Sequence, residues 1–251
     1  MREYRPDNNR EERLPILVWM HGGGFSFGGL DMNEAHLVAS ELVARAPAIV
    51  LSVDYRLAGH GVHHPVPLDD VHSVWLWAAA GNVGAGAVAI GGASAGANLA
   101  AASVLRSSMN GDPLPAALLL AYPVVHFPVP ALPFELAKTM AKELPDAPRF
   151  APEEIEKMFA NYVGGVSNFP VETVPGFGSV LGFPPTTVII SEFDDLRPSA
   201  ELFVRQLEES AVPVRRYLAP GMVHGHLNST SEIPEVAASL DVFADALRMM
   251  R

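Results

Sequence analysis

One twelve-residue stretch, Val88–Leu99, constrains the fold of this chain more than any other part of its sequence. Its apolar first part predicts a buried strand, and its Ala-rich second part, which continues to Leu105, predicts a helix. A Gly-x-Ser-x-Gly pattern lies between them, formed by Gly92, Ser94 and Gly96. Glycines beside a cramped turn residue avoid the clashes that a Cβ atom would make there. The serine hydroxyl is therefore expected at a helix N-terminus, where backbone N–H groups point toward a developing anion.

The rest of the chain repeats this alternation of apolar strands and amphipathic helices. The predicted strands are 14–20, 48–53, 88–90, 116–122, 186–193 and 214–218, and the predicted helices are 33–46, 69–80, 95–105, 152–162, 198–211 and 233–250. Strands that alternate with helices indicate a mostly parallel sheet with right-handed crossovers and helices on both faces. We therefore predict an α/β fold in a single domain over residues 1–251.

This alternation stops between residues 127 and 185, where prolines are frequent and one helix is expected, at 152–162. Seven of the twelve phenylalanines lie in this segment: Phe127, Phe134, Phe150, Phe159, Phe169, Phe177 and Phe183. They would form either the small core of an inserted subdomain or an apolar cap over a pocket. The two interpretations are compatible, and we predict a cap insertion over residues 127–185.

Several chemically active side chains follow predicted strands, and parallel sheets gather their chemistry at the carboxyl ends of their strands. A serine hydroxyl becomes a nucleophile when a histidine removes its proton. The histidine in turn needs an acceptor on its other ring nitrogen, which fixes its tautomer. We predict that Ser94, Asp194 and His224 supply these three roles.

Three consecutive glycines, 22–24, follow the first predicted strand. Such a run can be a simple flexible loop. Alternatively, it marks backbone that approaches another group closely or that takes positive φ angles. Attack on an ester carbonyl places negative charge on its oxygen, and free backbone amides stabilise that charge. The amide N–H groups of Gly23, Gly24 and Ala95 are the predicted donors of this oxyanion hole.

Two of these assignments have competitors nearby in the sequence. Asp194 could instead cap the following helix, which would leave Asp195 or Glu192 as the acid. His226 competes with His224 as the base. Asp194 is favoured because it comes first after its strand.

Composition excludes several other classes of function. The net charge of −11 argues against nucleic acid or an anionic membrane as a partner. No cysteine is present, so disulfides and thiolate chemistry are excluded. His60, His63 and His64 share one loop, but no acidic or cysteine ligand is spaced to complete a metal site, so no metal is predicted.

The polar segment Met1–Arg13 contains no apolar leader, and we expect a cytoplasmic protein without membrane spans. The sequence leaves a homodimer open. Asp54 and Arg56, which follow the second predicted strand, are predicted to form a buried structural pair.

Five motifs follow one another along the chain: His21–Phe25, Asp54–Ala58, Gly92–Leu99, Glu192–Arg197 and His224–Gly225. In this order they resemble the hormone-sensitive-lipase branch of the α/β-hydrolase fold, also called bacterial family IV esterases. The resemblance runs from about Tyr4 to the C-terminus and implies a serine carboxylesterase. It assigns the nucleophile to Ser94, the acid to Asp194 and the base to His224, and the oxyanion hole to Gly23, Gly24 and Ala95.

The chain departs from the family pattern at four places. Ala93 stands where the family has Asp, His226 stands where it has an aromatic residue, and Gly59–His63 are extra residues. Family members also carry cap helices and a first strand ahead of the position of Tyr4. We therefore expect the N-terminal cap helices to be absent, through a shortened chain or a reduced cap, which would leave the pocket more open.

The leading hypothesis is hydrolysis of short-to-medium acyl or aryl carboxylic esters through an acyl-enzyme, with a small-molecule ester as the partner and no cofactor. The alternatives are an amidase or arylformamidase, which uses the same machinery, and a ligand receptor on a non-catalytic hydrolase scaffold. Such receptors typically lack the catalytic histidine, whereas His224 is present. Lipase action on insoluble triglyceride is disfavoured because no amphipathic lid of sufficient length is evident.

Overall fold

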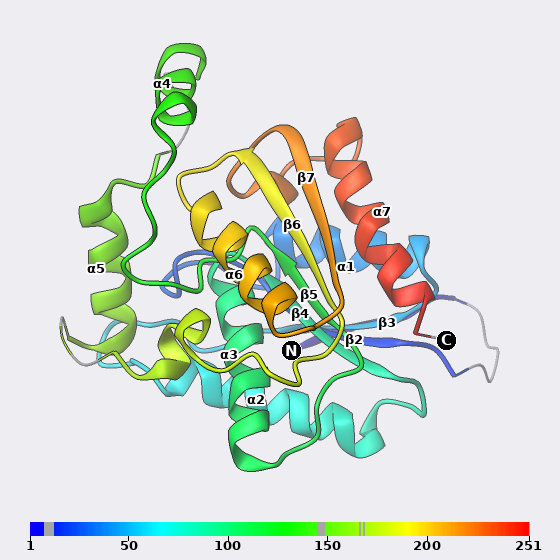
Figure 1. Cartoon of the computed structure of the whole chain (residues 1–251). Coiled ribbons are helices and arrows are strands. Elements are labelled where there is room, and N and C mark those ends of the chain that lie inside the picture. Colours follow the sequence, from blue (N-terminus) through cyan, green and yellow to red (C-terminus); the bar gives the residue numbers. More distant parts are fainter. Residues whose placement is uncertain (8–12, 145–148, 166, 168, 251) are drawn as a thin grey trace.

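Seven strands form one sheet in the order β1–β3–β2–β4–β5–β6–β7 (Figure 1). The computed structural model describes residues 1–7, 13–144, 149–165, 167 and 169–250. The strands are β1 (Arg2–Tyr4), β2 (Ile16–Met20), β3 (Ile49–Val53), β4 (Val88–Ala93), β5 (Leu118–Ala121), β6 (Thr186–Phe193) and β7 (Val214–Val223). The short edge strand β1 runs antiparallel to β3, and the other neighbouring strands are parallel. The prediction of a mostly parallel sheet is confirmed.

Helices cover both faces of this sheet, with α1 and α7 on one face and α2, α3 and α6 on the other (Figure 1). The helices are α1 (Asn33–Arg45), α2 (Val66–Trp77), α3 (Ala95–Asn110), α4 (Phe134–Glu143), α5 (Pro152–Val163), α6 (Arg197–Glu209) and α7 (Pro234–Arg248). Consecutive residues of β2 point to opposite faces: Ile16 joins the core under α2 and α3, and Leu17 joins the core under α1 and α7. A strand buried on both faces has no polar side, which explains the continuous apolar runs in the sequence.

Most predicted elements are observed with small changes at their ends. Helix α3 continues five residues beyond the predicted end, to Asn110, and stops at Gly111, whose φ of 74° suits glycine. Strand β7 continues to Val223 rather than ending at Leu218. Strand β1 was not predicted, because three mostly polar residues at a sheet edge show no hydrophobic pattern.

The connection between β5 and β6, residues 122–185, contains the helices α4 and α5 and two short 3₁₀ segments, Val171–Thr173 and Pro175–Phe177. The predicted helix 152–162 is confirmed as α5, whereas α4 was not predicted. Pro133 lies at the N-cap of α4, so the prolines precede that helix instead of preventing it. Residues 145–148, 166 and 168 of the predicted insertion lie outside the described residues.

Helix α5 packs against the glycine loop that follows β2. The Tyr162 ring stacks on Phe25, with ring centroids 3.9 Å apart, and Asn161 Nδ2 donates to Ser26 Oγ over 2.7 Å. By contrast, α4 projects away from the sheet (Figure 1), and its first residue, Phe134, is 76% exposed. The connection is therefore fastened through α5 and through the 3₁₀ segments, where Glu172 accepts hydrogen bonds from Arg106 of α3.

The prediction of a buried pair between Asp54 and Arg56 was wrong, because both side chains are exposed. The Arg56 guanidinium instead donates two hydrogen bonds to Asp70 on α2, over 2.8 and 2.9 Å. The Arg56 amide donates to the same carboxylate over 2.9 Å. The chain turns away from the sheet after β3, which brings Arg56 to the first turns of α2.

Candidate active site

Four consecutive strands of the sheet each deliver one side chain to the same place. Ser94 follows β4, Tyr122 follows β5, Asp194 follows β6 and His224 follows β7. The register of β6 on β7 shifts between Ser191 and Phe193, directly before Asp194. Such an irregularity re-aims the side chains beyond it. The carboxyl edge of the sheet therefore gathers these residues although they are widely separated in sequence.

The backbone at Ser94 takes the cramped conformation that the sequence pattern predicts, with φ of 53° and ψ of −117°. A Cβ atom at Gly92 would lie 2.5 Å from the Gly96 carbonyl. A Cβ atom at Gly96 would lie 2.3 Å from the Met20 carbonyl oxygen. Both positions therefore require glycine, because the turn presses its neighbours against backbone that cannot move aside.

The structure brings Ser94, Asp194 and His224 together in a hydrogen-bonded chain. His224 Nδ1 lies 2.7 Å from Asp194 Oδ2, and His224 Nε2 lies 2.8 Å from Ser94 Oγ. An ionised carboxylate only accepts hydrogen bonds, so Nδ1 carries the proton and Nε2 is left to accept from the serine hydroxyl. This tautomer allows the imidazole to act as a base toward Ser94.

Asp194 contacts His224 and is not the N-cap of α6, because that position is Leu196, which has no side-chain cap hydrogen bond. Oδ2 of Asp194 faces His224, while its Oδ1 accepts a hydrogen bond from the Leu196 amide over 2.8 Å, near the start of α6. The competing carboxylates are occupied elsewhere. Glu192 accepts from the Gly221 amide, and Asp195 pairs with Arg149.

Both ring nitrogens of the buried His226 lie beside serines other than Ser94. Its Nδ1 lies 3.0 Å from Ser191 Oγ on β6, and its Nε2 lies 2.9 Å from Ser239 Oγ on α7. Burial, together with the nearby His224, lowers the pKa of His226 to about 4. The ring is therefore neutral near pH 7 and links the sheet to α7.

The surroundings of His224 shift its pKa in the opposite direction from that of His226. Burial acts to lower its pKa, but the negative charge and hydrogen bond of Asp194 outweigh that effect, with smaller contributions from Glu34 and Asp195. The pKa of His224 is therefore raised above its ordinary value. This shift shows that the site stabilises the imidazolium, which a proton acceptor must become.

The glycine loop lies against the serine. A Cβ atom at Gly22 would lie 3.1 Å from Ser94 Cβ, and positive φ angles occur at Gly23 (109°) and Gly24 (58°). Within the described residues, the amides of Gly23, Gly24 and Ala95 donate to no protein acceptor. These donors are available to a ligand next to Ser94.

A buried carboxyl behind this loop has no counterpart in the sequence analysis. Glu34, in the first turn of α1, accepts hydrogen bonds from the Gly22 amide over 2.5 Å and the Tyr122 hydroxyl over 2.6 Å. The Tyr122 ring meets His224 edge-on, with ring centroids 4.9 Å apart. Burial raises the pKa of Glu34, although these hydrogen bonds oppose the shift. An acidic residue in a first helical turn is too common to signal such a role.

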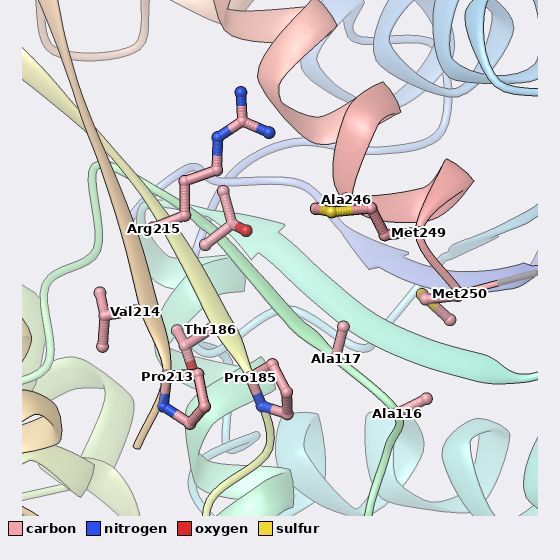
Figure 2. A pocket seen from close by; sticks show the side chains of 11 residues that line it. Ala116, Ala117, Pro185, Thr186, Pro213, Val214, Arg215, Ala246, Met249 and Met250 are labelled. Atoms are coloured by element: carbon pink, nitrogen blue, oxygen red, sulfur yellow. The ribbon is translucent and has the colours of Figure 1, made fainter. Parts of the chain in front are cut away.

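Two cavities differ in their position relative to the triad. One of about 200 Å³ lies in the β5–β6 connection and is lined by Phe150, whose ring meets His224 edge-on with centroids 4.8 Å apart. The other, of about 350 Å³, lies at the amino ends of β5, β6 and β7 (Figure 2). Its one charged lining residue, Arg215, pairs with Asp245. The larger cavity is therefore at the opposite edge of the sheet from Ser94.

No group of three or more metal-ligating side chains occurs in residues 1–7, 13–144, 149–165, 167 and 169–250. The loop histidines have other contacts: His63 Nδ1 lies 2.7 Å from the Asn161 carbonyl oxygen, and His64 Nε2 lies 3.3 Å from Glu172.

Comparisons with known proteins show which family this chain resembles. The family model of the alpha/beta hydrolase fold matches residues 17–228. Carboxylesterase NlhH of Mycobacterium tuberculosis is 32% identical over 94% of this chain and 74% of its own length, and esterase LipI of the same species is 30% identical over 96% and 74%. Carboxyl esterase 2 of Tuber melanosporum superposes with a TM-score of 0.83 at 26% identity, covering 99% of this chain and 80% of that one.

Proposed function

The chain belongs to the hormone-sensitive-lipase branch of the α/β-hydrolase fold and is a carboxylic ester hydrolase, and we propose that it cleaves short-to-medium acyl or aryl esters through an acyl-enzyme on Ser94. The observation that carries this proposal is the hydrogen-bonded chain from Ser94 through His224 to Asp194. Each contact joins a donor to the acceptor that the chemistry requires.

In the proposed mechanism, Ser94 Oγ attacks the ester carbonyl while His224 Nε2 takes its proton. His224 then gives this proton to the departing alcohol, which leaves the acyl group on Ser94. A water molecule, deprotonated by His224, attacks the acyl-enzyme and releases the acid. Asp194 holds the imidazole tautomer and stabilises the imidazolium in both steps.

We assign the oxyanion hole to the amides of Gly23, Gly24 and Ala95. Their lack of protein acceptors and the position of the loop beside Ser94 support this assignment. Each such donor is typically worth about 3 kcal/mol in the transition state. Glu34 fixes the first glycine of the loop, so these donors are held in place before substrate arrives.

We propose that the β5–β6 connection is the cap over this site and that the substrates are small uncharged esters. The apolar cavity of about 200 Å³ beside His224 supports this size and polarity. In the part of the chain that is described, no helix combines the length and apolar character that a bilayer crossing needs. The cytoplasmic location, the homodimer and the absence of a nucleic-acid partner stay predictions.

The test is the Ser94→Ala variant assayed with p-nitrophenyl acetate. We expect kcat to fall by about 10⁴-fold or more, because the nucleophile is lost while binding and the glycine loop remain. The melting temperature should change little, and a fluorophosphonate should label the wild-type chain but not the variant. Turnover close to that of the wild type would overturn the assignment. A matched anilide, assayed beside the ester, separates ester from amide preference.

A further inference from the structure

Two aromatic rings contact His224, Tyr122 at the end of β5 and Phe150 from the β5–β6 connection. Phe150 meets His224 edge-on, with centroids 4.8 Å apart and planes inclined at 73°. The same ring lines the cavity of about 200 Å³, whose walls also include Phe127, Val129, Leu132, Ile155 and Asp195. The catalytic base and this apolar cavity are therefore separated by a single side chain.

One carboxylate holds this part of the cap. The Phe150 amide donates to Asp195 Oδ2 over 2.9 Å. The Arg149 guanidinium donates to both carboxylate oxygens of Asp195, over 2.8 Å and 2.7 Å. The Asp195 side chain is 12% exposed, whereas that of Arg149 is 37% exposed. Asp195 therefore fixes two consecutive cap residues directly beside the triad acid.

The charge of Asp195 is compensated where it lies. Burial opposes ionisation of this carboxyl, but the hydrogen bonds from Arg149 and from the Phe150 amide bring its pKa below the ordinary value. With this charge paired to Arg149, the other side chains that line the cavity are apolar. Such a cavity favours an uncharged apolar group.

We propose that this cavity binds the apolar acyl or aryl group of the ester, and that Asp195 is the positioning residue that sets its size by holding Phe150 against His224. This inference rests on the proposed esterase function. Asp194 and Asp195, although adjacent in sequence, then have different roles. The first residue supports the base, and the second fixes the wall of the substrate subsite.

The experiment compares Asp195→Asn with the wild type on p-nitrophenyl acetate, butyrate and hexanoate. The variant keeps an oxygen for the Phe150 amide but loses the ion pair, so Phe150 is less firmly held. We expect KM for the hexanoate to rise about tenfold, with a smaller change in kcat and a smaller KM change for the acetate. An unchanged chain-length profile would overturn the proposal.

Asp70→Asn is the matched control. Asp70 binds Arg56 through two guanidinium hydrogen bonds and one backbone amide, which is the same pattern that Asp195 makes, but it does not line this cavity. We expect Asp70→Asn to leave the chain-length profile unchanged. A similar rise in the hexanoate KM with Asp70→Asn would mean that general loosening explains the effect, and the proposal would fail.

Phe150→Ala and the double variant Phe150→Ala/Asp195→Asn test whether Asp195 acts through Phe150. If it does, the double variant matches Phe150→Ala, whereas additive effects would overturn the proposed route. Should Asp195→Asn not fold, Arg149→Gln breaks the same ion pair and should also raise the hexanoate KM. Failure of the proposed function looks different, since the wild type would then neither turn over the acetate nor react with a fluorophosphonate.

Discussion

Ser94, Asp194 and His224 each follow a strand of one sheet, whereas Phe150 belongs to the β5–β6 connection, whose described residues form no strand. The strand ends are held by parallel ladders and by cores on both faces of the sheet. The β5–β6 connection is held by α5, by ring stacking such as Phe25 on Tyr162, and by polar contacts that include the Arg106–Glu172 ion pair and the hydrogen bond between the Phe150 amide and Asp195.

Under the proposed function, this difference separates catalysis, which takes place at the strand ends, from substrate selection in the β5–β6 connection. Residues that carry out the chemistry need fixed distances, which the sheet supplies because its strand ends cannot move independently. Under the same proposal, the residues that select the substrate lie in the β5–β6 connection, outside the strand ends, where they can change without disturbing the triad. Substitutions in the two regions should therefore differ in the size and kind of their effects.

The largest effect is expected at the sheet edge. Asp194→Asn should lower kcat for p-nitrophenyl acetate by about 10⁴-fold, because an amide can hold the wrong imidazole tautomer. The asparagine oxygen can still accept from the Leu196 amide, so melting temperature should change little. A kcat within tenfold of the wild type would show that the strand-end geometry is not decisive.

The acid side of the pH–rate profile should reflect the raised pKa of His224. The base acts only when neutral, so kcat/KM should fall about tenfold per pH unit as the pH drops below this pKa. The midpoint should lie above the ordinary imidazole value of about 6.5, because Asp194, Glu34 and Asp195 outweigh burial and the neighbouring His226 stays neutral. A midpoint below that value would contradict this electrostatic account.

An intermediate effect is expected behind the glycine loop. Glu34→Gln should lower kcat about tenfold and reduce the free energy of unfolding by about 1–3 kcal/mol, because one buried donor loses its acceptor. The donors to this carboxylate are the Gly22 amide, the Tyr122 hydroxyl and the Asn228 side-chain amide. Glu41→Gln, near the other end of α1, is the control and should leave kcat unchanged. Equal losses of kcat in both variants would exclude a specific role for Glu34.

The smallest effect is expected in the cap. The Tyr162 hydroxyl is buried and has no hydrogen-bond partner within the described residues. Tyr162→Phe keeps the stack on Phe25 and removes this unpaired group, so the free energy of unfolding should stay the same or rise by up to about 1 kcal/mol. Tyr122→Phe at the sheet edge is the matched substitution and should destabilise the protein, because it leaves Glu34 with one hydrogen bond fewer. Chemical denaturation of both variants measures the two changes in the free energy of unfolding. A clear destabilisation by Tyr162→Phe would contradict the prediction.

Much of the site could be predicted from local patterns. The strand, the Gly-x-Ser-x-Gly turn and the helix of Val88–Leu99 occur as predicted, since backbone sterics at adjacent residues decide them. The order of the strands in the chain indicated which polar residues meet at the carboxyl edge. The sequence did not predict α4, whose prolines indicated irregular structure, or the exposed positions of Asp54 and Arg56.

Local sequence patterns were enough to predict the alternating strands and helices and the turn at Ser94, and to favour Asp194 and His224 over their neighbours. The positions of Glu34 beside Tyr122, 88 residues away, and of Asp195 beside Phe150, 45 residues away, became visible only in the folded chain. The physical reason is the range of each interaction. Backbone sterics and the spacing of hydrophobic residues depend on a few neighbouring positions, so they can be recognised in the sequence. The hydrogen-bond partners of a buried carboxylate lie far away in the chain and are brought close only when the core packs.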